Sequence, residues 1–573
     1  MLSAAMGIDQ ELRAAAEAWV ADDPDPVTRD EVAQLLAAGD AAGLAERFTA
    51  PLTFGTAGIR GPLGAGPARM NRAVVRRVTA GLAAWLHERG SPGEVVLGRD
   101  ARHGSSEFAD EAAAVLAGAG LAVRRFAEPV PTPLLAFAVR SLGAAAGVQI
   151  TASHNPAGDN GYKVYVPGGL PLAPPDDAAL AAAIAAVGPL ADVPVAAAAD
   201  PQRGRLAASV EADYLQAARN VAGGAAHPER LRVVVTPLHG VAGRLLLDVI
   251  HGAGFSDVVP VAEQLDPDPD FPTVAFPNPE EPGALDLARA LAAERDADLV
   301  LATDPDGDRI AVAIPEDGWR TLTGDEVGCL LAEHLLTLDA HLPGRPLVAT
   351  TVVSSRLLSR IAAAHGAAYA ETLTGFKWLA PVAEQAQASR QRFVLAYEQA
   401  LGVMAGDAVR DKDGITAALL FATFAAGLKA RGATVAGALD DLAVRHGVHA
   451  TLGRSLRVDD PEQIARMLDG LRRRPAREVA GVPVVAVADH AAGVRRHTDG
   501  TAEPLPTPAA DLLELMLADG SRCLARPSGT EPLLKCYLEA VEPVTSHDID
   551  AARARAEERA TRLADAFLAH LDR

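Results

Sequence analysis

Short apolar runs, each followed by a turn signal and then a helix-like stretch, recur along this chain of 573 residues. Clear examples are 147–150, 231–235, 298–302 and 392–396, and helix-like segments such as 285–295 lie between them. Strands that alternate with helices favour an α/β fold with largely parallel sheets. Ligands of such sheets bind at the loops that follow the strands, so we look for chemistry there.

The length of the chain and changes in its local composition predict several domains. At roughly 100–200 residues per domain, a chain of this size predicts three to five. Segments rich in Gly, Ala and Pro at 188–204 and 223–228 mark possible boundaries, and a strand near Pro346 could open a further domain. Past about Thr451, helices frame short strands, which predicts a final α+β domain.

Composition excludes some classes of protein. The net charge of −21 disfavours a partner that is nucleic acid or an anionic membrane surface. The three cysteines form no C-x-x-C pair, which is typical of a reducing cytoplasm. The first residues lack the basic and apolar blocks of a signal peptide, and the apolar segment 178–191 is shorter than the ~20 residues of a membrane span. We therefore expect a cytoplasmic protein without membrane contact.

The loop 151–163 reads T-A-S-H-N-P-A-G-D-N-G-Y-K and follows a buried strand. Ser153 is a candidate nucleophile or phosphoryl carrier, with His154 and Lys163 in range to act with it. A serine that only caps a strand-to-helix turn is the alternative. The loop lacks the G-x-S-x-G turn of α/β-hydrolases, so a serine hydrolase is not favoured.

A second loop, 304–309, reads D-P-D-G-D-R after another apolar strand. Its three carboxylates, Asp304, Asp306 and Asp308, alternate along a turn and would repel one another unless a cation joined them. Hard oxygen ligands suit Mg²⁺. An EF-hand is excluded because Arg309 stands where that loop needs glycine, whereas a solvated acidic turn remains an alternative.

A third loop, 526–535, reads R-P-S-G-T-E-P-L-L-K. Arg526 offers a bidentate fork for a phosphate group, and Gly529 lets backbone N–H groups approach an anion closely. Ser528 and Thr530 add hydroxyls, and Lys535 adds a charge. The loop is no Walker A motif, since G-K-[ST] occurs nowhere in the chain. An ordinary turn before a strand is the alternative.

Together these loops resemble the α-D-phosphohexomutase superfamily, from about Phe54 to Glu539. The resemblance implies four domains around a central cleft, three similar α/β domains with mixed sheets and a C-terminal α+β domain. The boundaries that we predict are 1–222, 223–340, 341–451 and 452–573. The strings at 276–281, 374–378, 397–400 and 411–414 look closest to the branch that contains phosphoglucomutase-2 and phosphopentomutase.

The resemblance also implies roles for single residues. Ser153 would carry the phosphate and complete the Mg²⁺ shell of the three aspartates, and His154 and Lys163 would be acid/base candidates. Arg60, in the opening motif 54–60, would face the cleft. Substrate contacts are implied for a wider set: Arg309, Gly375, Lys377, Glu398, Ala400, Arg410 and Lys412. Many members have serine where this chain has Ala400, which leaves sugar preference open.

By this resemblance, the reaction interconverts a sugar 1-phosphate and 6-phosphate through phosphoserine and a bisphosphate intermediate. Mg²⁺ and an activating sugar 1,6-bisphosphate would be the cofactors. Glucose is the first candidate sugar, with mannose or a pentose as alternatives. A sugar 1,6-bisphosphate synthase, a non-catalytic sugar-phosphate sensor and a metal-dependent phosphatase are the competing functions. Small-molecule sugar phosphates are the expected partners, and a monomer and a dimer are both compatible with the sequence.

Overall fold

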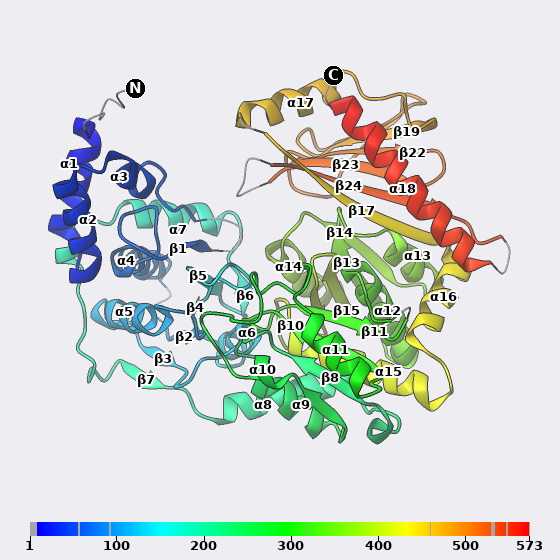
Figure 1. Cartoon of the computed structure of the whole chain (residues 1–573), viewed down its shortest axis with the longest axis horizontal. Coiled ribbons are helices and arrows are strands. Elements are labelled where there is room, and N and C mark those ends of the chain that lie inside the picture. Colours follow the sequence, from blue (N-terminus) through cyan, green and yellow to red (C-terminus); the bar gives the residue numbers. More distant parts are fainter. Residues whose placement is uncertain are drawn as a thin grey trace. The chain divides into compact units, whose positions relative to one another are not determined.

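A computed structural model describes residues 8–54, 58–90, 93–316, 318–458, 460–528, 533–545 and 548–571. The chain divides into two compact units. The first unit holds residues 1–322 and 402–427, and the second holds 323–401 and 428–573. Figure 1 shows the elements along the chain, from blue at the N-terminus to red at the C-terminus.

The first unit begins with three helices that pack on one another around Val32 and Leu44. Each helix starts at an aspartate whose side chain accepts hydrogen bonds from backbone N–H groups of the first turn, as N-cap residues do. These helices are α1 (Gln10–Asp22), α2 (Pro26–Ala38) and α3 (Ala41–Phe48).

A seven-stranded sheet follows, with the order β1-β5-β4-β2-β3-β7 and β6 paired to β5. Strands β4, β2, β3 and β7 pair in parallel, whereas β5 and β1 pair antiparallel at one edge. Its strands are β1 (Ile59–Pro62), β2 (Val95–Arg99), β3 (Val123–Arg125), β4 (Ala146–Ile150), β5 (Asp159–Val166), β6 (Leu170–Pro171) and β7 (Arg203–Arg205). The accompanying helices are α4 (Arg72–Glu88), α5 (Ser105–Gly118), α6 (Thr132–Ser141), α7 (Asp176–Ala185), η1 (Leu190–Asp192) and α8 (Ser209–Ala222).

The second sheet of the first unit has five strands in the order β12-β11-β10-β8-β9. Its central strands are fully buried runs of Val, Leu, Ile and Ala, as expected for strands covered on both faces. The strands are β8 (Val233–Thr236), β9 (Val258–Pro260), β10 (Leu299–Thr303), β11 (Ile310–Ile314) and β12 (Arg320–Thr321). The helices are η2 (Pro228–Arg230), α9 (Gly243–Gly252), α10 (Ala262–Leu265) and α11 (Asp286–Glu294).

In the second unit, β13 lies between β14 and β15, and both pairs are parallel. These strands are β13 (Arg345–Thr351), β14 (Ala368–Thr372) and β15 (Gln391–Glu398). The chain continues into β16 (Gly402–Ala405) of the first unit. The helices of this stretch are α12 (Gly324–Leu338), η3 (Asp339–His341), α13 (Leu357–Ala364), α14 (Phe376–Ala388), α15 (Gly414–Ala430) and α16 (Val435–His446).

The last sheet is antiparallel, with the order β17-β24-β23-β22-β19-β20-β21 and β18 paired to β19. Helix α18 crosses it, as Figure 1 shows in red, and buries Leu563 and Phe567 against it. The strands are β17 (Val448–Arg457), β18 (Glu478–Val479), β19 (Val482–Asp489), β20 (Val494–His497), β21 (Ala502–Pro504), β22 (Leu513–Leu517), β23 (Arg522–Pro527) and β24 (Leu533–Glu542). The helices are α17 (Pro461–Arg473) and α18 (Ile549–Leu571).

This architecture confirms the predicted α/β class with a different C-terminal domain. The predicted runs at 147–150 and 392–396 fall inside β4 and β15. The sheets of the first unit are mixed, as the resemblance implies, because antiparallel strands β5 and β11 follow the strands that carry the serine and aspartate loops.

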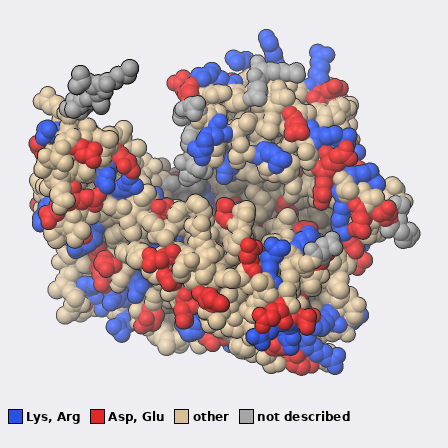
Figure 2. All heavy atoms as spheres, in the orientation of Figure 1, with Lys and Arg blue, Asp and Glu red and all other residues tan. Residues whose placement is uncertain are grey.

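Charged side chains of both signs are interspersed on the face shown in Figure 2. Among the described residues, no single helix has the length and apolar composition of a membrane span, although the sharply bent pair α15 and α16 meets both criteria together.

Candidate active site

The serine loop leaves β4 and turns sharply at Ser153. This residue has a φ of +54°, in the left-handed region that non-glycine residues seldom occupy, and its side chain is buried. Ser153 Oγ donates to Asp304 Oδ2 at 2.8 Å and lies 3.2 Å from His154 Nδ1. The structure therefore brings together three of the predicted residues: the serine, the histidine and one aspartate.

Arg102 holds the serine loop in place, and sequence reasoning missed it. Its guanidinium donates to four backbone carbonyl oxygens of the loop, those of Ser153, Asn155, Pro156 and Asp159. Asp100 lies beside this buried arginine, 3.4 Å from its Nε. The sequence shows only that Arg102 follows β2 at a strand end, and nothing local links it to a loop about fifty residues away.

The aspartate loop connects β10 to β11. Gly307 has a φ of +72°, and a Cβ there would lie 2.9 Å from both Ala242 and Pro131, so the turn requires glycine. The backbone N–H groups of Asp308 and Arg309 donate to Asp304 Oδ1 at 3.1 and 3.0 Å. As a result the three carboxylates are buried, and one oxygen of each lies within 4.8 Å of the others.

Two lysines face this acidic cluster. Lys163 Nζ donates to Asp306 Oδ2 at 2.6 Å and to Asp308 Oδ2 at 3.0 Å, and Lys412 Nζ lies 3.3 Å from Asp308 Oδ2. Thr132 Oγ1 also donates to Asp306, at 2.7 Å. These contacts exclude a solvated surface position for either lysine.

Burial and charge act on the pKa of each group. Burial, reinforced by the neighbouring carboxylates, raises the pKa of Asp304 well above its usual value. Burial also acts to raise the pKa of Asp306, but the ammonium of Lys163 together with the hydrogen bonds from Lys163, Asp304 and Thr132 lowers the pKa overall. Conversely, burial and the adjacent guanidinium groups of Arg309 and Arg60 lower the pKa of His154, so its imidazole is neutral.

The donor set fits a divalent cation. Asp306 Oδ1 and Asp308 Oδ1 are buried and have no hydrogen-bond partner among the described residues, which is costly unless a ligand completes them. Both are hard oxygen atoms, the kind that Mg²⁺ prefers. The aspartate cluster is therefore a candidate metal centre rather than a solvated turn.

Three predicted arginines lie in the same unit with different partners. Arg60, on β1, donates to Asn155 Oδ1 at 3.4 Å and so contacts the serine loop. Arg309 pairs with Glu280 at 3.1 Å, which joins the aspartate loop to the string at 276–281. Arg410 pairs with Asp407 at 2.9 Å.

In the second unit, Glu398 ends β15 and its Oε1 accepts the N–H of Gly375 at 2.7 Å. Gly375 has a φ of +109° and begins α14, where Lys377 is buried with its ammonium 5.5 Å from the centre of the Trp378 ring. Ala400 lies in the turn after β15. The two predicted sugar-binding strings at 374–378 and 397–400 thus meet at one strand end.

The predicted phosphate loop lies between β23 and β24 of the same unit. Arg526 Nη2 donates to Tyr537 Oη at 2.9 Å, and Lys535 is its partner in the β-ladder. The backbone N–H of Ser528 donates to the carbonyl oxygen of Leu533 at 2.8 Å. Gly529 and Thr530 lie outside the described residues, so their part in a phosphate site stays a prediction.

Comparison with known families finds four successive matches. Residues 51–189 match the phosphoglucomutase/phosphomannomutase alpha/beta/alpha domain I, 212–318 match domain II, 323–444 match domain III, and 471–556 match the C-terminal domain.

Similar proteins cover nearly the whole chain. A probable phosphoribomutase of Schizosaccharomyces pombe is 36% identical over 93% of this chain and 94% of its own length. A probable phosphomannomutase of Haemophilus influenzae is 37% identical over 82% and 93%. The crystal structure of a putative phosphomannomutase from Thermus thermophilus is 26% identical, covers 89% of this chain and 99% of its own, and superposes with a TM-score of 0.63. The chain therefore belongs to the phosphoglucomutase/phosphomannomutase family and is a phosphosugar mutase.

Proposed function

We propose that this mutase carries its phosphoryl group on Ser153 and works with Mg²⁺. The observation that carries the proposal is the 2.8 Å hydrogen bond from Ser153 Oγ to Asp304, which puts the candidate nucleophile in contact with the candidate metal ligands. A sensor or a solvated acidic turn would need neither the contact nor the buried carboxylates.

Asp304, Asp306 and Asp308 would hold the Mg²⁺ ion, together with an oxygen of phosphorylated Ser153. Bound there, the ion neutralises charge on the transferring phosphoryl group, which is the main electrostatic requirement of phosphoryl transfer.

The chain's own residues supply the remaining roles. His154 Nδ1, 3.2 Å from Ser153 Oγ, is within reach to exchange a proton with that oxygen as the phosphoryl group leaves and returns. Lys163 instead contacts two of the metal ligands, so we assign it the stabilisation of charge. Arg102 fixes the loop that carries the serine.

The second unit would bind the sugar phosphate. Glu398 and Gly375 would take sugar hydroxyls, and Arg526, Ser528, Gly529, Thr530 and Lys535 would hold the phosphate that does not react. A hydroxyl of the sugar 1-phosphate takes the phosphoryl group from Ser153, giving a bisphosphate. The bisphosphate then returns its other phosphoryl group to Ser153. A sugar 1,6-bisphosphate would prime the serine in the first turnover.

Two sugar phosphates are our main candidates for the substrate. Glucose 1-phosphate is our first candidate. Ribose 1-phosphate is the second, because relatives named phosphoribomutase and phosphopentomutase align with 93–95% of this chain, whereas those named phosphomannomutase or phosphoglucomutase align with 82–86%. The three cysteines are buried and unpaired, which supports a cytoplasmic enzyme.

Phosphorus NMR tests the proposal. Purified protein with Mg²⁺ and a trace of sugar bisphosphate receives glucose, mannose or ribose 1-phosphate in separate tubes. Conversion to the 6- or 5-phosphate without free phosphate is expected, and Ser153→Ala should abolish it. Release of inorganic phosphate that matches the sugar consumed would indicate a phosphatase. Turnover only after an acyl phosphate is added would indicate a bisphosphate synthase.

A further inference from the structure

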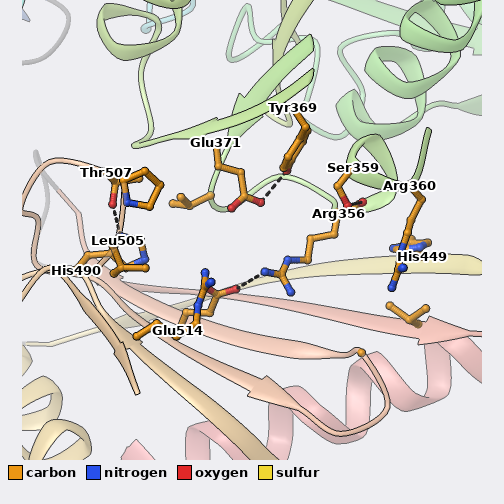
Figure 3. A pocket seen from close by; sticks show the side chains of 15 residues that line it. Arg356, Ser359, Arg360, Tyr369, Glu371, His449, His490, Leu505, Thr507 and Glu514 are labelled. Atoms are coloured by element: carbon orange, nitrogen blue, oxygen red, sulfur yellow. Dashed lines mark hydrogen bonds and ion pairs between the residues drawn. The ribbon is translucent and has the colours of Figure 1, made fainter. Parts of the chain in front are cut away.

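A cavity of about 370 Å³, lined by charged, polar and apolar side chains, lies inside the second unit. Helix α13 and strand β14 form one wall, and strands of the C-terminal antiparallel sheet form the other. Figure 3 shows its lining, with His490 and Thr507 toward one end and Arg360 and His449 toward the other. Within the described part of the chain, its lining contains no residue of the sugar-binding strings or of the phosphate loop at 526–535.

Three buried nitrogen atoms on residues of this wall lack hydrogen-bond partners within the described chain. They are Nε2 of His449, Nε2 of His490 and Nε of Arg495. Both imidazoles are almost fully buried, with 2% of the His449 side chain and 2% of His490 exposed. Buried polar atoms normally have a hydrogen-bond partner, so these atoms indicate a ligand that forms hydrogen bonds with them.

Hydrogen bonds on the other ring nitrogens limit what the imidazoles can offer. His449 Nδ1 lies 2.8 Å from a carboxylate oxygen of Glu539, which can only accept. Nδ1 therefore carries a proton, and the unpartnered Nε2 suits a hydroxyl group, which can both donate and accept. His490 Nδ1 lies 2.8 Å from Thr507 Oγ1, which can donate or accept.

Guanidinium groups supply positive charge from both walls of the cavity. Arg360 is exposed and forms no hydrogen bond or ion pair with another described residue. Arg356 is 3.9 Å from Glu514, which is held more closely, at 3.2 Å, by Arg522. Arg495 pairs with Glu503 through Nη1, and its Nε is buried with no partner among the described residues.

We propose that this cavity is a second binding site, for a small phosphate monoester that also carries hydroxyl groups. Guanidinium N–H groups are the donors that match phosphate oxygens, and a hydroxyl matches the unpartnered imidazole nitrogens. The volume is within the range of small-molecule sites. A dianionic phosphate would be held by Arg360 and Arg356, and hydroxyl groups would reach the imidazole nitrogens along the cavity.

Binding there would join two parts of the second unit. Arg356 and Arg360 belong to the segment that matches domain III, and His490 and Arg495 belong to the C-terminal domain. A ligand that contacts both would favour one arrangement of these domains over others, so the site would act as an effector site.

Titration calorimetry with glycerol 3-phosphate tests the site, because this probe carries a phosphate monoester and two hydroxyls. The measurement uses the full chain with Arg526→Gln, which weakens the active-site phosphate loop. Binding should persist in this background and fall about tenfold or more when Arg360→Gln is added, since a charge-assisted hydrogen bond is lost. Arg473→Gln, a matched change of an exposed arginine outside the cavity, should leave the affinity unchanged.

Location is tested separately by soaking crystals with tungstate, a phosphate mimic visible by anomalous scattering. A peak beside Arg360 is expected. Peaks confined to the loop at 526–535 would overturn the proposal. So would equal affinities of the Arg360→Gln and Arg473→Gln proteins, or binding of glycerol or citrate as tight as that of glycerol 3-phosphate.

Discussion

Each unit of the molecule buries a cluster of charges, and the two clusters are built in opposite ways. In the first unit, Asp304, Asp306 and Asp308 face one another with Lys163 as their closest cation, and two carboxylate oxygens have no partner in the described chain. In the second unit, Arg522 pairs with Glu539 at 2.7 Å and with Glu514 at 3.2 Å. We call these the acidic centre and the arginine cluster.

The charged groups of the arginine cluster find their hydrogen-bond and ion-pair partners within the chain. Arg522 also donates to the carbonyl oxygens of Val352 and Ser354, and Glu539 accepts from Ser355 Oγ and the N–H of Arg356. Burial acts to raise the pKa of Glu539, but Arg522, His449 and Ser355 together lower it overall. Removing one member of a complete buried charge cluster destabilises the fold, whereas a cluster that is left incomplete indicates a ligand.

The largest effect should follow from Asp304→Asn in the acidic centre. The change removes a metal ligand charge and the acceptor of the Ser153 hydroxyl, so kcat should fall by about 10³- to 10⁴-fold. Steady-state mutase assays at saturating Mg²⁺ measure it.

In the same variant, stability without metal should change little, because one of three mutually repelling carboxylates is lost. Thermal unfolding in EDTA is the control. Activity within about tenfold of the parent enzyme would show that the acidic centre is not the catalytic metal site.

Arg522→Met should have the opposite effect, because it should mainly reduce the stability of the protein. It leaves Glu539 and Glu514 buried without their cation, which costs about 3–5 kcal/mol. Urea unfolding measures the change, and Arg473→Gln should stay within about 0.5 kcal/mol of the parent. A stability equal to that of the control would mean that the arginine cluster does not stabilise the second unit.

A buried carboxylate can also be neutralised by a proton, and Asp325 is an example. The carboxyl accepts from Ser355 N at 2.7 Å and Tyr397 Oη at 3.0 Å. Burial, with a contribution from Glu539, raises its pKa to about 6. Between about pH 4 and 6 the folded state then binds more protons than the unfolded state, so this group lowers the unfolding free energy as pH rises.

Asp325→Asn should remove that dependence. Relative to the variant, the parent protein should lose about 2–3 kcal/mol of unfolding free energy between about pH 4 and 6. Urea unfolding of both proteins across this range measures it. Parallel pH profiles would contradict the raised pKa.

The comparison also explains what the sequence could and could not predict. The acidic centre was predictable because its ligands are adjacent in one loop after one strand, so that local spacing alone brings Asp304, Asp306 and Asp308 together. The α/β class was predictable for the same reason, since strands such as β4 and β10 are uninterrupted apolar runs.

Residues that act across long separations were not predictable. Arg102 reaches a loop about fifty residues away, and Arg522 meets carbonyl groups about 170 residues away. From sequence alone, a single arginine is predicted to be a surface charge, and only the topology of the sheets reveals that it is buried. Lys163 was found because it shares a string with Ser153, although its ion pairs with Asp306 and Asp308 depend on the fold.

The last prediction separates a cluster that binds a cation from one that does not. Mg²⁺ at about 100 times its dissociation constant should stabilise the folded parent protein by about 2.7 kcal/mol, because it binds the assembled acidic centre and not the unfolded chain. Thermal unfolding with and without Mg²⁺ measures this gain. Asp304→Asn should lose most of it, whereas Asp325→Asn, which changes a buried carboxyl of the second unit, should keep it. Equal gains in both variants would mean that Mg²⁺ binds elsewhere, and the acidic centre would then owe its arrangement to Lys163 and Lys412 alone.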